Sequence, residues 1–143
     1  MKLLGFNFDK ISIEKKKKLE RPVNINSNVE IKDIKKAELD LLGKKDTLLF
    51  DYEFTVDYNH DAVKLIIQGN VLILFNEESE DIKKILQDWK KKELSKEINI
   101  SLLNLVFSKC NLKALQLEED LNIPPHLPNP VFSPKDKKEN NKN

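Results

Sequence analysis

The chain has 143 residues and a mass of 16.7 kDa, with 25 basic residues against 24 acidic ones. This length suits one domain, which we expect over residues 1–132, and is too short for two full domains. A net charge of +1 with a single arginine argues against nucleic-acid binding, which favours a strongly basic surface. One cysteine and two histidines exclude an internal disulfide and predict no metal site and no cofactor.

Apolar and polar residues alternate in the first third of the chain, which predicts strands. The alternating apolar positions begin with Phe6, Phe8, Ile11 and Ile13. Four lysines at 15–18 interrupt the pattern and predict a solvated connection. Polar residues 26–28 predict a turn. The three-residue step from Ile31 to Ile34 then predicts a bulge or the end of a strand.

Two long strands joined by a tight polar connection are the clearest feature of the sequence. Residues 47–58 alternate without a break, and residues 62–75 follow after a short polar connection at 59–61. The second strand is apolar on both sides, so we expect both of its faces to be covered. Gly69 within it predicts a bulge or a close contact. The first strand carries the apolar residues Leu48, Phe50, Tyr52, Phe54, Val56 and Tyr58 on one face.

Helical spacing replaces the alternation after residue 79. A short amphipathic helix is predicted to about residue 92, with Trp89 on its apolar stripe, and a long helix over 95–121. The long helix is apolar around much more than one face, whereas a sheet covers one side only. We therefore expect its other side to contact another subunit in a homo-dimer or tetramer. The interface candidates are Leu103, Val106, Phe107 and Cys110.

Four prolines within residues 124–130 predict an extended segment after the long helix. Leu127, Val131 and Phe132 are candidates to anchor this segment on the surface. Residues 133–143 form a tail rich in lysine and asparagine, which we expect to be disordered.

Catalysis is poorly supported by the sequence, since Asp51, Glu53 and Asp57, which share one strand face, are typical of the solvent face of an antiparallel sheet. The three glycines are isolated, so no glycine-rich phosphate loop is present. Cys110 lies on an apolar helical stripe and is expected to be a small buried thiol, and His60 and His126 are expected to be solvent or packing residues. No apolar stretch is long enough to cross a membrane and no signal peptide is evident, so we expect a cytoplasmic protein without membrane insertion.

Two stretches carry a family resemblance. FDYEFTVDYNHDAVKLIIQGNVLILF is a hairpin of long strands, and INISLLNLVFSKCNLKALQLEEDLNIPPHLPNPVF is a helix that ends in a proline-rich segment. This order resembles the SecB-like family, particularly its small archaeal members. The resemblance implies an α+β fold in which about four antiparallel strands precede a short and a long helix. It also implies an ATP-independent, non-enzymatic chaperone that binds unfolded polypeptide and is linked to protein export.

The chain also departs from this family. Bacterial SecB is markedly acidic and docks on an export ATPase, whereas this chain is nearly neutral, so the export role is not carried over. SecB-like grooves are apolar and aromatic, which implies Phe50, Tyr52, Phe54 and Trp89 as peptide-binding candidates. The alternative hypothesis is a structural subunit or adaptor of a larger complex that docks through its helices and its proline-rich segment.

Overall fold

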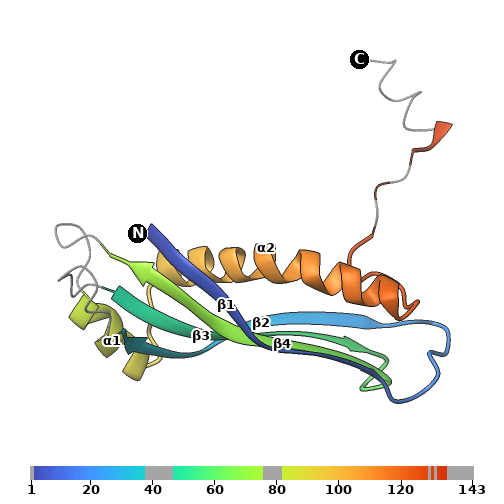
Figure 1. The fold of residues 1–143 in the computed structure, drawn as a ribbon, viewed down its shortest axis with the longest axis horizontal. Helices are drawn as coiled ribbons and strands as arrows, with labels where there is room; N and C mark the ends of the chain where they lie inside the picture. The colour runs from blue at the N-terminus through green and yellow to red at the C-terminus, as the bar shows by residue number, and fades with distance from the viewer. Residues whose placement is uncertain (1, 38–46, 76–81, 129, 131, 135–143) are drawn as a thin grey trace.

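The computed structural model describes residues 2–37, 47–75, 82–128, 130 and 132–134. These residues form one four-stranded antiparallel sheet followed by two helices, as predicted (Figure 1). The strands lie in the order β1-β4-β3-β2. The elements are β1 (Lys2–Lys15), β2 (Ile25–Lys36), β3 (Thr47–Tyr58), β4 (Val63–Leu74), α1 (Ile82–Lys90) and α2 (Lys96–Asp120).

The β3–β4 hairpin occupies the centre of the sheet, because its strands are the most apolar of the four. The strands pair in unbroken register from Thr47 opposite Leu74 to Tyr58 opposite Val63. The connecting turn contains three successive residues with positive φ, Asn59, His60 and Asp61. The two strands expected at 47–58 and 62–75 are therefore confirmed.

The edge strand β2 corrects one expectation and confirms another. Residues 26–28 do not form a turn but pair with β3, because the ladder of backbone hydrogen bonds holds them while their side chains face solvent. The bulge is confirmed: pairing passes from Ile31 opposite Tyr52 to Asp33 opposite Asp51, so Lys32 is the extra residue. Ile31 and Ile34 are consequently both buried, while Lys32 and Asp33 between them are exposed.

Helix α2 lies along one face of the sheet (Figure 1). It begins after Ser95, whose hydroxyl accepts a hydrogen bond from the N–H of Ile98 at 3.3 Å. Its fully buried stripe faces the aromatic side of β3 and consists of Leu102, Val106, Cys110, Ala114 and Glu118. On the opposite face of the sheet, Ile66, Leu72 and Leu74 of β4 remain half-buried within the described chain, so the expected full cover of both faces is not observed there.

Hydrogen bonds hold the segment after α2, and of the predicted apolar anchors Leu127 is half-buried. The hydroxyl of Tyr58 donates to the carbonyl of Pro124, and the side chain of His126 is buried. Phe132, in contrast, is 98% exposed, so its predicted anchoring role is wrong. Val131 and most of the predicted tail, residues 135–143, lie outside the described residues.

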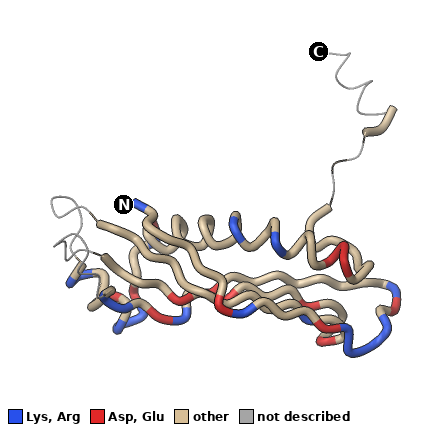
Figure 2. The backbone as a smooth tube through the Cα atoms, in the orientation of Figure 1, with Lys and Arg blue, Asp and Glu red and all other residues tan. Residues whose placement is uncertain are grey.

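None of the described helices combines the length and the apolar character needed to cross a membrane. Lysine and arginine are concentrated at two ends of the sheet, around the β1–β2 connection and around α1 (Figure 2).

Candidate functional site

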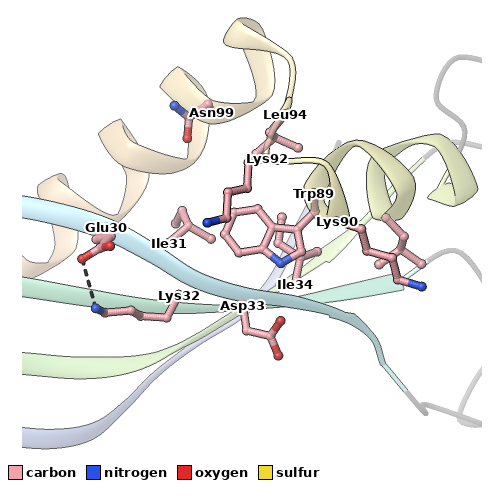
Figure 3. Close-up of a pocket in the computed structure, with 11 residues that line it drawn as sticks. Glu30, Ile31, Lys32, Asp33, Ile34, Trp89, Lys90, Lys92, Leu94 and Asn99 are labelled. Atoms are coloured by element: carbon pink, nitrogen blue, oxygen red, sulfur yellow. Dashed lines mark ion pairs between the residues drawn. The ribbon is translucent and has the colours of Figure 1, made fainter.

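A groove of about 730 Å³ lies between the second half of β2, the C-terminal end of α1 and the first turn of α2 (Figure 3). Its lining is contributed by segments that are far apart in the sequence. The lining residues are Glu30, Ile31, Lys32, Asp33, Ile34, Leu86, Trp89, Lys90, Lys92, Leu94 and Asn99.

The apolar part of the groove follows from two local patterns. On β2, the bulge at Lys32 turns both Ile31 and Ile34 toward the helices. On α1, Ile82 and Ile85 are fully packed in the core, whereas Leu86 and Trp89 lie at the edge of the same helical stripe and remain half-buried. Leu86 and Trp89 are therefore the apolar side chains of this part of the groove that solvent can reach, whereas Ile31 and Ile34 are buried.

The groove runs beside an unpaired strand edge. β2 pairs with β3 on one side, and no strand among the described residues pairs with its other side. An edge strand presents backbone N–H and C=O groups that can pair with another extended chain. Apolar pockets next to such an edge are typical of peptide recognition by strand addition.

Charged groups rim the apolar part. Lys32 forms ion pairs with Glu30 at 3.0 Å and with Glu53 at 3.9 Å. The hydrogen bond to Glu30, followed by the charge of Glu53, raises the pKa of Lys32 above its ordinary value. Lys90, Lys92 and Asp33 have no ion-pair partner among the described residues.

The end of α1 places Lys92 at the groove. The N–H of Glu93 donates to the carbonyl of Asp88 at 2.8 Å, and the N–H of Lys92 donates to the carbonyl of Trp89 at 3.0 Å. These two bonds form a Schellman motif, in which the residue after the cap adopts the left-handed conformation and is usually glycine. Here Lys92 occupies that position with a φ of 58°.

Of the four predicted peptide-binding residues, only Trp89 lines the groove. Phe50, Tyr52 and Phe54 are at most 1% exposed, so their assignment to an accessible peptide surface is wrong. They lie on a central strand under α2: Tyr52 stacks on Phe6 with ring centroids 4.9 Å apart, and Phe54 lies 6.0 Å from the ring of Phe107. These aromatic residues form the core beside the groove.

Sequence reasoning missed Ile31, Ile34, Leu86, Leu94 and Lys92 as members of one site. The step between Ile31 and Ile34 was a usable signal, because it shows that both side chains leave the regular alternation on the same face. No local sequence pattern predicts that β2 lies next to the end of α1, because the whole β3–β4 hairpin separates these two segments in the chain.

The predicted interface residues also divide between two environments. Val106 and Cys110 are fully buried against the sheet of their own chain, so they are not on the outer side of α2, and this part of the prediction is wrong. Burial raises the pKa of the Cys110 thiol to about 12. Leu103 and Phe107 are half-buried. The exposed large apolar residues of β1 and α2 are Leu3, Leu4, Phe8, Ile11, Ile100 and Leu112.

A second buried polar cluster lies at the far end of α2. The carboxylate of Glu118 accepts a hydrogen bond from the backbone N–H of His126 at 2.9 Å and also contacts the imidazole Nδ1. The imidazole Nε2 lies 2.6 Å from Oδ1 of Asn111. Within the described ranges, no group of three His, Cys, Asp or Glu residues is arranged to hold a metal ion.

No protein-family model matches the chain, and no curated protein matches it. Among solved structures, the chain is similar to the Mycobacterium tuberculosis Rv1957 SecB-like chaperone in complex with a ChAD peptide from the Rv1956 HigA1 antitoxin. The two chains are 11% identical with a TM-score of 0.61, and the match covers 92% of this chain and 89% of the other. The likeness shows that the fold is SecB-like; the archaeal branch of the family stays a prediction.

Proposed function

We propose that this protein is an ATP-independent, non-enzymatic chaperone-like protein that binds extended apolar segments of unfolded polypeptide in the groove beside β2. One observation carries this proposal: an accessible apolar surface around Trp89 lies next to an unpaired strand edge. The SecB-like neighbour, whose structure contains a bound peptide, supports it.

The chemistry of the groove suits an extended chain. Backbone groups of a bound segment form hydrogen bonds with the free edge of β2, and these bonds give affinity that does not depend on the side chains of the segment. Side chains of the segment then contact the half-buried Leu86, Trp89 and Leu94. Because burial of apolar surface has no preferred direction, such binding tolerates many sequences. Export is not part of this function, because the chain is nearly neutral whereas bacterial SecB, which docks on an export ATPase, is markedly acidic.

We also propose that the protein acts as a homo-dimer or tetramer. Exposed apolar residues on β1, including Phe8 at 40% and Ile11 at 42%, lie on the helix side of the second edge strand. Leu112, on the outer side of α2, is 69% exposed. A second copy that pairs with the β1 edge through a twofold axis covers the β1 residues, and a contact between the outer sides of two α2 helices covers Leu112, whereas β2 stays available for a client.

Trp89 provides a direct test, because it is the only tryptophan of the chain and lines the groove. Titration with an apolar peptide that lacks tryptophan is expected to shift the emission of Trp89 to shorter wavelength. In parallel, stoichiometric protein is expected to suppress aggregation of a chemically denatured model substrate, such as citrate synthase, without added nucleotide.

Matched variants locate the activity. Leu94→Ser removes a half-buried apolar side chain from the groove and is expected to weaken both readouts. Leu72→Ser removes a half-buried leucine from the opposite face of the sheet and is expected to preserve them. If the wild-type protein holds no substrate in several-fold excess, the chaperone hypothesis is wrong. Recovery of one stoichiometric partner in a pull-down then favours the adaptor hypothesis.

A further inference from the structure

A binding site that recognises apolar side chains alone does not need charged residues around it, yet charged side chains surround this groove. We propose that the groove selects apolar segments flanked by acidic residues, and that Lys92, with Lys90, is the specificity determinant. This inference rests on the proposed function and names the class of polypeptide that the groove prefers.

The balance of available charge in the groove is positive. Five charged side chains line it, but Glu30 and Lys32 neutralise each other across 3.0 Å. Two lysines, Lys90 and Lys92, and one carboxylate, Asp33, remain, and none of these three has an ion-pair partner within the described chain. A bound segment that brings a carboxylate completes an ion pair, whereas one that brings an ammonium group meets two like charges.

The surroundings of the groove reinforce this sign. Around α1 and the adjoining part of β2, lysines outnumber the acidic residues that lie among them (Figure 2). In Figure 3 the ammonium groups of Lys92 and Lys90 lie on opposite sides of the Trp89 side chain. A segment that places an apolar residue against Trp89 therefore has a lysine near it in either chain direction.

The backbone of Lys92 provides an independent argument. Its φ of 58° lies in the left-handed region. Glycine adopts this conformation freely and asparagine and aspartate tolerate it, but other residues bear a steric cost there. The corresponding position at the end of α2 is held by Asn122, with a φ of 54°, which is a residue that tolerates this conformation. Lys92 forms no ion pair in the described structure that would offset the strain of its left-handed backbone. Backbone strain of this kind is typical of a functional position.

Three unlabelled peptides with the same core of alternating leucine and phenylalanine test the inference. They differ only in flanking residues, which are aspartate, asparagine or lysine, and all lack tryptophan so that Trp89 reports binding. At low ionic strength we expect the aspartate peptide to bind about three- to tenfold more tightly than the asparagine peptide, and the lysine peptide to bind most weakly. The differences should disappear at about 0.5 M salt, because exposed charges are screened.

Lys92→Gly separates specificity from folding. The variant relieves the backbone strain, so its melting temperature is expected to stay the same or to rise, while the preference for the aspartate peptide falls toward unity. Asn122→Gly is the matched control, since it makes the same backbone change at the end of α2 and is expected to keep the preference. Lys84→Ala removes an exposed charge of α1 that does not line the groove and should also keep it.

Equal affinity for the three peptides at low salt, or tighter binding of the lysine peptide, overturns the charge preference and leaves the proposed function intact. A preference that survives in Lys92→Gly and in Lys90→Gln overturns the assignment to these residues. If no peptide changes the emission of Trp89 and no substrate is held, both the proposed function and this inference are wrong.

Discussion

The carboxylate of Glu118 lies 2.8 Å from Nδ1 of His126, and the two side chains are only 1% and 0% exposed. Glu118 also accepts the backbone N–H of His126, so one carboxylate holds both the main chain and the side chain of that residue. The imidazole packs edge-on against Phe54 and Phe107. This pair attaches the proline-rich segment to the end of α2, and thus to the core.

We predict that Glu118→Ala lowers the free energy of unfolding by about 3 kcal/mol, because it leaves two buried donors of His126 without an acceptor. Glu118→Gln keeps one acceptor oxygen and should lose about half as much. Urea unfolding measures both changes. Glu119→Ala, at the exposed neighbouring position, should stay within about 0.5 kcal/mol of the wild type, and a loss equal to that of Glu118→Ala would contradict the assignment.

Alkaline pH is predicted to destabilise the protein. Burial, together with the charge of Cys110 in the first case and of Glu118 in the second, raises the pKa of Tyr52 and of Tyr58 well above the ordinary value of 10.0. Burial likewise raises the pKa of Cys110 from 9.0 to about 12. The unfolded chain therefore releases these protons at lower pH than the folded chain, and this favours unfolding.

The stabilising contribution of these groups is thus complete below about pH 9 and is lost as the pH rises through 10 and beyond. Melting temperatures recorded from about pH 8 to about pH 11 should fall steadily. Tyr58→Phe, which has no proton to release, should reduce the steepness of this fall. A melting temperature that is constant over the range would show that these hydroxyl and thiol groups are accessible to solvent.

Gly69 is predicted to be irreplaceable by alanine. A Cβ atom at this position would lie 1.9 Å from the carbonyl oxygen of Asn7 and 2.6 Å from Oη of Tyr52. The hydroxyl of Tyr52 donates a hydrogen bond of 2.8 Å to that carbonyl. The methyl group of an alanine at position 69 would therefore push β1 away from the core. We expect Gly69→Ala to cost about 3 kcal/mol or more in urea unfolding. Gly5→Ala, where a Cβ atom has an ordinary contact at 3.9 Å, is the control and should be nearly neutral.

The assembly is tested at two exposed apolar positions. Light scattering of the wild-type protein at micromolar concentration is expected to give a dimer or tetramer. Phe8→Asp on β1 and Leu112→Asp on α2 should each reduce the size of the assembly and retain a cooperative melting transition, because these side chains are 40% and 69% exposed within one chain. A wild-type protein of 16.7 kDa in solution would contradict the proposed assembly.

The sequence by itself determined the local elements. The unbroken alternation of residues 47–58 identifies a strand, because a period of two cannot place six large apolar residues on one side of a helix. The start of α2 after Ser95 and its end near Leu121 follow from capping and helical spacing. The bulge at Lys32 was readable from the step between Ile31 and Ile34. These features depend on neighbours in the chain.

The tertiary structure alone decided which apolar residues are accessible. Phe54 and Trp89 are both aromatic residues on apolar stripes, yet Phe54 lies on a central strand under α2 and Trp89 lies at the open edge beside β2. The face on which a residue lies follows from local periodicity. Its solvent exposure depends on strand order and on where the helices pack, which are set by contacts between residues far apart in the chain. The groove and its rim of lysines exist only after those contacts have formed.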